Sequence, residues 1–384
     1  MLEIALIVIT AIPALVWLYV VLVIPWLARH IPELSALPES SLPLPRLSIV
    51  IAARNEAGEI EAALGTLLAQ DYPDLEIIVI DDRSDDGTGD ILRRMADTHA
   101  RLHAIHIHGL PEGWLGKNHA LQAGFSAAKS EYVLFTDADV HFAPRALRRA
   151  LAHMQVQALD HLACAPRLIN AKPSMRVMLP AFAVLFLQIT RPWNVGDPRS
   201  RAHIGIGAFN LVRRTALQAV DGFERIRMRP DDDLMLAKLL KTNGHRAGFA
   251  MAGEDVSVEW YTSAAETIRG LEKNAFAQFE YSALRTLAAL LLVLFLVFAP
   301  LAGMLLPGIA GALSMLASAC MLGFAAMVAW RIGISWMWGL LFPLGALLVC
   351  YATWRSMRVT LRKNGITWRD TFYPLERLRE NRLP

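Results

Sequence analysis

The sequence predicts an α/β fold, a parallel sheet wrapped by helices, joined to apolar membrane helices at both ends of the chain. Three observations predict this class. Between about residues 47 and 145, short apolar runs typical of buried strands alternate with helical stripes. The runs 2–27 and 287–329 are nearly free of charge and long enough to cross ~30 Å of hydrocarbon. With 54% hydrophobic residues, the 384-residue chain is too apolar for one soluble domain.

Charge and cysteine content exclude two broad classes. The net charge is only +3, and basic residues do not interleave with aromatic ones in patches, so we expect no nucleic-acid partner. The three cysteines are odd in number and lack the spacing of metal ligands, so neither a zinc site nor a disulfide framework is indicated.

The N-terminal segment 1–28 is predicted to be a retained transmembrane anchor. A secretory signal, the competing interpretation, would need a basic start and a shorter apolar core. Arg29 and His30 follow directly, which places the next residues in the cytoplasm by the positive-inside rule. A stiff extended linker is then predicted from its prolines, Pro32, Pro38, Pro43 and Pro45.

Four strands and their helices are predicted at the start of the domain 46–282. The expected strands are 47–52, 76–80, 101–107 and a run that begins at Tyr132. The expected helices are 60–68, a segment that ends near residue 100, 117–128, and one opened by Pro144. Ligands of such sheets bind beyond the carboxyl ends of the strands, so the residues at those ends are the most informative.

Polar residues gather at these strand ends. Ala53, Arg54, Asn55 and Glu56 follow the first strand, 81–88 (DDRSDDGT) follows the second, 116–119 (GKNH) precedes a helix, and Asp137 and Asp139 follow the fourth strand. Asp81 or Asp82 is placed to accept a hydrogen bond from a base N–H, and Lys117 at a helix start is placed to meet a phosphate. Each motif alone fits a cap or turn, but together they predict an anionic nucleotide site.

Asp137 and Asp139 are predicted to lie on one side of the chain, since they are two residues apart at the end of a strand. Adjacent carboxylates repel each other unless a cation lies between them, and hard oxygen ligands suit Mg²⁺ or Mn²⁺ carrying phosphates. An acidic turn after a strand is the alternative interpretation.

A third acidic cluster, Asp231 to Asp233, precedes a helical pattern over 234–242. Ordinary helix capping explains one such acid, but three exceed what a cap needs. Partial burial and mutual repulsion would raise one pKa towards neutrality, as a general base for a hydroxyl requires. Upstream, Gly205 and Gly207 would permit the close backbone approach of a sugar or acceptor pocket, or form a plain turn. His103, His106 and His108 have no acidic partner nearby in sequence and are given no role.

The remaining apolar segments set the membrane layout. The segment 174–190 contains Pro180 and is short, so it is predicted to lie in the membrane interface. Two spanning helices with a turn at Pro307 and Gly308 begin the region 284–354. The tail 355–384 carries eight basic residues against three acidic ones and should be cytoplasmic. Three crossings would put this tail outside, so the last apolar segment, 332–351, is predicted to be re-entrant or interfacial.

In order, the motifs ARNE, DDRSDDGT, GKNHAL, DAD and PDDD resemble the motif series of family 2 glycosyltransferases, which have the GT-A fold. The likeness covers roughly Leu47 to Ala277, and the membrane layout is similar to ceramide glucosyltransferases and to hopene-associated and carotenoid glycosyltransferases. One motif of processive synthases, Gln-x-x-Arg-Trp, is missing, and Lys273 stands in the segment where it should be.

The resemblance implies a role for each matching residue. Ala53, Arg54, Glu56 and one of Asp81 or Asp82 would hold the base and ribose of a nucleotide sugar, with Lys117 assisting. Asp137 would touch the nucleotide, and Asp139 would bind a divalent metal, Mg²⁺ or Mn²⁺. Asp233 would be the catalytic base, with Asp232 as its neighbour. Lys273 is the candidate cation that would neutralise the diphosphate.

The implied function is that of an inverting enzyme in the cell (inner) membrane. It would move one sugar from a nucleotide donor, expected to be a UDP-sugar, to a lipid acceptor at the cytoplasmic face. Two alternatives remain. A polyprenyl-phosphate glycosyltransferase would have a phosphate as acceptor and need no strong base, and a silent membrane scaffold would use the same fold to bind a partner.

Overall fold

The computed structural model describes residues 1–37, 43–169 and 172–383. It divides into two compact units. The sheet unit comprises Ile31–Ile169, Thr190–Glu259 and Glu376–Pro384, and the helical unit comprises Met1–His30, Asn170–Ile189 and Trp260–Leu375. Part of the predicted proline-rich linker, including Pro38, lies outside the described residues.

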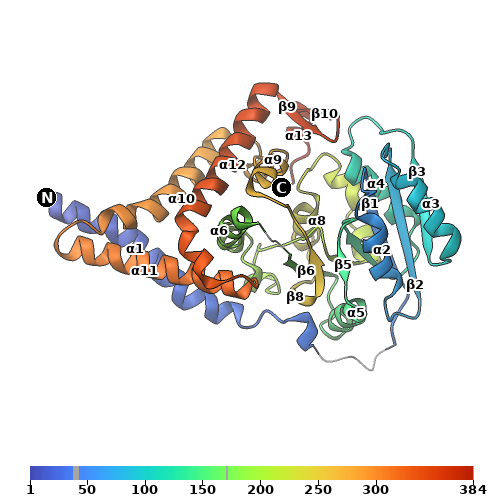
Figure 1. Ribbon diagram of the computed structural model, residues 1–384, viewed down its shortest axis with the longest axis horizontal. Coiled ribbons are helices and arrows are strands. Elements are labelled where there is room, and N and C mark those ends of the chain that lie inside the picture. Colours follow the sequence, from blue (N-terminus) through green and yellow to red (C-terminus); the bar gives the residue numbers. More distant parts are fainter. Residues whose placement is uncertain (38–42, 170–171, 384) are drawn as a thin grey trace. The chain divides into compact units, whose positions relative to one another are not determined.

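The sheet unit is built on one mixed sheet (Figure 1). Within the described part of the chain it has eight strands in the order β3-β2-β1-β4-β7-β6-β8-β5. Their bounds are Leu47–Ala53 (β1), Leu75–Asp82 (β2), Leu102–Ile107 (β3), Tyr132–Thr136 (β4), His141–Phe142 (β5), His161–Leu168 (β6), Asn210–Arg213 (β7) and Ala247–Val258 (β8). The strands β1 to β4 are mutually parallel, as predicted, so their carboxyl ends lie along one edge.

The strands after β4, which were not predicted individually, make the sheet mixed. Strand β7 runs antiparallel to both β4 and β6, and β5 runs antiparallel to β8. The chain reaches β7 through the long connection 169–209, which leaves the sheet and re-enters it in the opposite direction. No local pattern of residues marks that reversal, because strand direction depends on pairing and not on side-chain alternation.

Helices cover both faces of the sheet and create two hydrophobic cores. On one face, Ile49 and Ile51 pack with α2 (Ile60–Leu68), α3 (Thr88–Thr98) and α5 (Ala146–Val156). On the other face, Val50 and Ile80 pack with α4 (Gly116–Ala127), α7 (Arg214–Gln218) and α8 (Asp232–Thr242). Because alternate residues of a strand point to opposite faces and both faces are covered, β1 and β2 are mostly apolar. The polar exceptions are Ser48 in β1 and Glu76, Asp81 and Asp82 in β2. The predicted helix positions are confirmed, except that α5 begins at Ala146 and not at Pro144.

The end of the chain belongs to the sheet unit. Helix α13 (Leu375–Glu380) leads to Leu383, which is buried in the second core. The backbone N–H of Met228 donates to Oδ1 of Asn381 at 3.0 Å, and Nζ of Lys238 donates to the carbonyl of Leu383 at 3.1 Å. The last residues are therefore fixed to the same body as the sheet.

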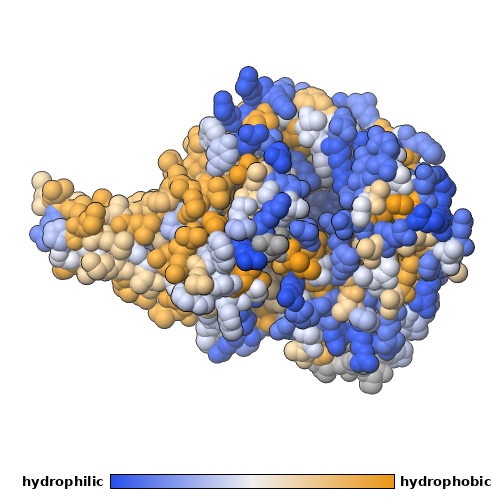
Figure 2. Space-filling view, in the orientation of Figure 1, coloured by the Kyte–Doolittle hydropathy of each residue, from blue (hydrophilic) through white to orange (hydrophobic). Residues whose placement is uncertain are grey.

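The helical unit holds most of the apolar helices. They are α1 (Leu2–Ala28), α6 (Pro173–Thr190), α10 (Ala283–Gly303), α11 (Gly308–Arg331) and α12 (Phe342–Lys363). The unit also contains the short polar helix α9 (Ala264–Gly270) and, after α12, the hairpin β9 (Gly365–Trp368) and β10 (Thr371–Pro374). Among the described residues, five helical segments are long and apolar enough to cross a membrane, those built on α1, α6, α10, α11 and α12. Figure 2 shows hydrophobic surface over α1, α10 and α11 and mostly hydrophilic surface over the sheet unit.

Two details of the predicted segments differ. Helix α12 runs on to Lys363, past the predicted boundary at residue 354, so the first basic residues of the tail lie on its last turns. The segment predicted to be interfacial forms the 18-residue helix α6 despite Pro180. Its position in the membrane interface stays a prediction.

Candidate active site

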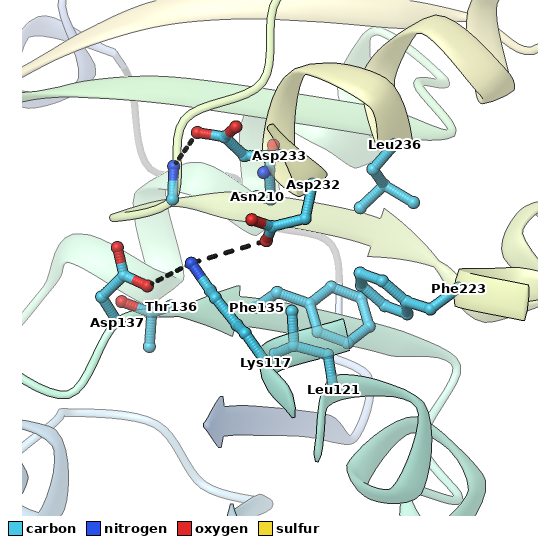
Figure 3. A pocket seen from close by; sticks show the side chains of 11 residues that line it. Lys117, Leu121, Phe135, Thr136, Asp137, Asn210, Phe223, Asp232, Asp233 and Leu236 are labelled. Atoms are coloured by element: carbon cyan, nitrogen blue, oxygen red, sulfur yellow. Dashed lines mark hydrogen bonds and ion pairs between the residues drawn. The ribbon is translucent and has the colours of Figure 1, made fainter. Parts of the chain in front are cut away.

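A pocket lies where the end of β4 meets the starts of α4 and α8 (Figure 3). It brings together four residues predicted from the sequence, Lys117, Asp137, Asp232 and Asp233. The other lining residues are Leu121, Phe135, Thr136, Gly207, Asn210, Phe223 and Leu236. Of these, only Gly207 was singled out by its sequence context. The side chains of Leu121, Phe135 and Leu236 belong to predicted elements whose pattern indicates core.

Lys117 lies between two acidic motifs. Its Nζ is 2.7 Å from Oδ1 of Asp137 and 3.4 Å from Oδ2 of Asp232 (Figure 3). Burial alone would lower the pKa of Lys117, but the carboxylates of Asp137, Asp232 and Asp233 outweigh burial and raise this pKa above its ordinary value. The ammonium therefore stays charged and neutralises part of the carboxylate cluster.

Asp233 is held by two backbone donors. The N–H of Gly207 donates to its Oδ2 at 2.9 Å, and the N–H of Leu234 donates to its Oδ1 at 2.7 Å. Burial, reinforced by the charge of Asp232, raises the pKa of Asp233 to about 7. This carboxyl can therefore take up or release a proton near neutral pH, as a general base must.

Asp231, the first acid of the third cluster, forms an ion pair and does not line the pocket. Asp231 receives two hydrogen bonds from the fully buried guanidinium of Arg229, from Nε at 2.9 Å and from Nη2 at 2.8 Å. This bidentate pair fixes the start of α8. Asp232 and Asp233 are the two acids of the cluster that line the pocket.

Two glycines let the loop before β7 pass close to these acids. A Cβ at Gly205 would lie 1.8 Å from the backbone oxygen of Asp233, and a Cβ at Gly207 would lie 2.6 Å from Oδ2 of Asp137. In the structure, the two glycines therefore allow the backbone to pass close to Asp137 and Asp233.

Replacing Gly205 by alanine is expected to displace the start of α8 and to remove most activity, because the added methyl group meets backbone that cannot move by itself. Overpacking of this kind costs about 1–3 kcal/mol, seen as a lower melting temperature. Gly65→Ala is the matched control. Gly65 lies inside α2 with nothing within 4 Å of its Cβ position, so alanine there should raise stability by about 0.5–1 kcal/mol. Equal stability and activity of both variants would contradict this account of Gly205.

Asp139 lies beside this pocket but does not line it. Burial, together with the charges of Asp137 and Glu56, raises the pKa of Asp139 to about 6. A carboxylate in this situation is stabilised by an added cation. Among the residues that the structure describes, no three His, Cys, Asp or Glu side chains form a metal-binding group. One or two carboxylates that share a metal with substrate phosphates are nevertheless the usual protein contribution to a Mg²⁺ site, so the donor set fits such an ion.

The loops after β1 and β2 are joined by four hydrogen bonds. The N–H of Asn55 donates to Oγ of Ser84 at 3.0 Å, and Oδ1 of Asn55 accepts from the N–H of Asp85 at 3.0 Å. The N–H of Glu56 donates to Oγ1 of Thr88 at 2.9 Å, and the N–H of Ala57 donates to Oδ2 of Asp86 at 3.0 Å. The later residues of DDRSDDGT thus hold the ARNE loop in place.

The two predicted base-binding acids point to opposite faces of the sheet. Asp82 accepts two hydrogen bonds from Arg83, at 2.7 and 3.0 Å, and lies 4.0 Å from Nη1 of Arg54. Oδ2 of Asp81 lies 2.9 Å from Nδ1 of His106, so this histidine has an acidic partner that is distant in sequence. The parallel register sets Asp81 opposite His106 on the adjacent strand, a proximity that sequence distance conceals.

The other predicted site residues are placed as follows. Ala53 is the buried last residue of β1. Lys273 belongs to the helical unit, where its Nζ lies 4.2 Å from the ring centroid of Trp368. Its proposed contact with a diphosphate stays a prediction.

Comparison with known proteins assigns the domain. The family model described as "Glycosyl transferase family 2" matches residues 48–221. These residues form a family 2 glycosyltransferase domain, which confirms the family predicted from the motifs, and with the observed sheet it confirms the predicted α/β class of the GT-A type.

Individual relatives are similar over parts of their length. The succinoglycan biosynthesis protein ExoO of Rhizobium meliloti is 30% identical over 220 residues, which are 55% of this chain and 60% of that protein. The 4,4'-diaponeurosporenoate glycosyltransferase of Staphylococcus haemolyticus is 32% identical over 117 residues, 29% of this chain and 30% of the relative. The solved mannosyltransferase PcManGT from Pyrobaculum calidifontis, in complex with GDP-Man and Mn²⁺, gives a TM-score of 0.49 with 22% identity, covering 92% of this chain and 96% of that one. The matched segments thus span less than two thirds of either curated relative.

Proposed function

We propose that this protein is an inverting glycosyltransferase that moves one sugar from a nucleotide sugar, expected to be a UDP-sugar, to a hydroxyl of a membrane lipid. The observation that carries the proposal is Asp233, a half-buried carboxyl with a pKa of about 7, in one pocket with Lys117 and Asp137. A family 2 glycosyltransferase domain supplies the context. The pocket lies at the edge of the parallel strands where α/β sheets bind ligands.

In the proposed reaction, Asp233 accepts the proton of the acceptor hydroxyl as the oxygen attacks the anomeric carbon of the sugar. The bond between this carbon and the diphosphate oxygen breaks, and its electron pair leaves with the nucleoside diphosphate. The backbone N–H groups of Gly207 and Leu234 hold the carboxylate in place. Asp232 keeps the pKa of Asp233 high, so that the base is strong enough for a hydroxyl.

Lys117 and Asp139 are assigned the task of neutralising the negative charge of the leaving nucleoside diphosphate. Asp139, together with Asp137, would hold a divalent cation, which supplies positive charge against the departing diphosphate. The base and ribose of the nucleotide are assigned to Arg54, Glu56 and the acids at the end of β2. Hydrogen bonds between residues 55–57 and 84–88 hold the loops after β1 and β2 together. Lys273 remains the candidate for a further diphosphate contact.

A lipid acceptor is supported by the composition of the helical unit and by one relative. Five apolar helical segments among the described residues are long enough to cross a membrane. The relative named 4,4'-diaponeurosporenoate glycosyltransferase takes, by its name, 4,4'-diaponeurosporenoate as acceptor.

The test is release of nucleoside diphosphate from a panel of nucleotide sugars by the detergent-purified full chain, with and without extracted bacterial lipid. We expect release with one donor, stimulated by lipid. Nucleotide binding without release from any donor would favour the silent scaffold over the enzyme.

We further infer that the sheet unit lies wholly on one side of the membrane, the cytoplasmic side. Strands β6 and β7 are hydrogen-bonded to each other, so α6 between them cannot cross the membrane once. Strand β8 and the residues after 375 belong to the same unit, so the segment 260–375 must cross an even number of times. Of α10, α11 and α12, at most two cross. Helix α12 carries Arg355, Arg358 and Arg362, whose burial in lipid is costly, so we assign the crossings to α10 and α11.

Single-cysteine labelling tests this topology. In a chain whose three native cysteines are replaced by alanine, Leu305→Cys in the α10–α11 turn should react with a membrane-impermeant maleimide in intact cells with a permeable outer layer. Arg199→Cys and Arg382→Cys should react only after lysis. Labelling of either of the latter two in intact cells would contradict the inferred layout.

A further inference from the structure

A buried histidine and an asparagine behind the pocket form a pair that the proposed reaction does not use. His161 in β6 is fully buried, and its Nε2 lies 3.0 Å from Oδ1 of Asn210, the first residue of β7. The same Oδ1 accepts a hydrogen bond from the N–H of Ile206 at 3.4 Å. Asn210 is itself buried and lines the pocket beside Asp232 and Asp233 (Figure 3).

The chemistry of the pair fixes the proton on the histidine. An amide oxygen only accepts hydrogen bonds, so Nε2 of His161 must be the donor. Among the residues that the structure describes, Nδ1 of His161 has no hydrogen-bond partner, as expected of the ring nitrogen that carries no proton. Burial also lowers the pKa of His161 to about 4, so the ring is neutral near pH 7 and its one proton is the one donated to Asn210.

The orientation of the asparagine follows. Both hydrogen bonds of its side chain, to His161 and to Ile206, use the oxygen. A rotated amide would set its NH₂ group against the backbone N–H of Ile206, which can only donate. The nitrogen Nδ2 is therefore the polar group that Asn210 can offer to the pocket, where the other polar side chains are three carboxylates, one ammonium and the hydroxyl of Thr136.

The hydroxyl of Thr136 already donates to the carbonyl of Ala208 at 2.8 Å. The ammonium of Lys117 is engaged by Asp137 and Asp232. Asn210 differs from these neighbours because its NH₂ group is a neutral donor. Its orientation is set by His161, which does not line the pocket. A neutral N–H donor suits the oxygen of a hydroxyl group, which needs no countercharge.

We propose that Asn210 binds a hydroxyl oxygen of the substrate through Nδ2, and that His161 is a positioning residue that fixes the amide in the orientation needed. This inference rests on the proposed function, since it assumes that a sugar or an acceptor hydroxyl enters the pocket. The hydroxyl belongs either to the donor sugar or to the acceptor, and the binding experiment separates the two.

The experiment measures dissociation constants of UDP-glucose, UDP-galactose and GDP-mannose, and of UDP and GDP, for the full chain in detergent, together with KM for extracted lipid. One neutral hydrogen bond corresponds to an effect of about 3- to 10-fold. If the hydroxyl belongs to the donor sugar, Asn210→Ala should weaken the nucleotide sugar by this factor and leave the nucleoside diphosphate unchanged. If it belongs to the acceptor, both constants should stay unchanged while KM for lipid rises by the same factor.

His161 is tested by a matched pair of variants. In His161→Gln, the side-chain Nε2 replaces the ring N–H donor. The dissociation constant of the nucleotide sugar and the KM for lipid should therefore stay at their wild-type values. His161→Leu removes the donor. This variant should show the same change as Asn210→Ala, either weaker binding of the nucleotide sugar or a higher KM for lipid. Melting temperatures are recorded for each variant, and if His161→Leu does not fold, Asn210→Ala and Asn210→Ser still test the binding residue.

Two results would overturn the inference while leaving the proposed function intact. Unchanged binding and KM in Asn210→Ala would show that Nδ2 meets no ligand. Equal weakening of the nucleotide sugar and the nucleoside diphosphate would show that the pair only supports the fold. Absence of nucleotide binding by the wild-type chain would instead overturn the proposed function, and this inference with it.

Discussion

Replacing Asp233 by asparagine is expected to lower kcat by about 10²- to 10⁴-fold, the usual contribution of a positioned general base. Asparagine keeps the size of the side chain, and its one oxygen can still accept the hydrogen bond from either Gly207 or Leu234, although not from both. Binding of nucleotide should therefore persist while turnover is lost. Asp90→Asn, on the exposed surface of α3, is the control and should behave as wild type.

The pH dependence follows from the same group. Its pKa is raised from 3.8 to about 7, so the base is protonated and inactive below this pH and becomes available as pH rises. In the free enzyme kcat/KM should fall about tenfold per pH unit below about pH 7. Asp232→Asn removes the neighbouring charge that raises this pKa and should move the acidic limb to lower pH. Full activity of Asp233→Asn would contradict the assignment and favour a phosphate acceptor, which needs no strong base.

Asp139→Asn is expected to abolish metal-dependent catalysis, with a loss of about 100-fold or more at a fixed Mg²⁺ or Mn²⁺ concentration. The amide keeps the shape of the carboxylate but removes its charge, and the half-buried cluster with Asp137 and Glu56 then attracts a cation less strongly. The measurement is a metal titration of nucleoside diphosphate binding. The midpoint should move to higher metal concentration in the variant.

The matched control for this variant is Asp74→Asn, since Asp74 is exposed and its partner is Arg46 on the surface. Its metal titration should overlay that of the wild type. In EDTA both variants should bind nucleotide equally well. Unchanged metal dependence in Asp139→Asn would remove this residue from the cation site.

The sequence predicts the parallel half of the sheet and the residues at its edge well, for a physical reason. The motifs ARNE, DDRSDDGT and DAD each follow a buried strand, and parallel strands bring their carboxyl ends to one edge. The resemblance to the family adds Asp233 to the site of Asp137. The structure lines one pocket with both. Lys117 was placed by the same rule at a helix start, although its partners are carboxylates in the structure.

What the sequence does not predict depends on pairing across the sheet. His106 meets Asp81 only through the register of β2 and β3, and His161 meets Asn210 only because β7 inserts antiparallel beside β6. Asp231 differs from Asp232 and Asp233 because it binds the buried Arg229. The sequence around Arg229 is also typical of a turn, so it does not predict this pair. The steric need for Gly205 is likewise set by the position of α8.

The measurement that tests the central claim most directly is the mass of the lipid product. The detergent-purified chain is incubated with the donor that gives the greatest release, a divalent metal and extracted lipid, and the organic phase is analysed by mass spectrometry beside Asp233→Asn. The account predicts one lipid species heavier by a single sugar residue, absent with the variant. A ladder of several sugars, or release of nucleoside diphosphate with free sugar and no modified lipid, would contradict it.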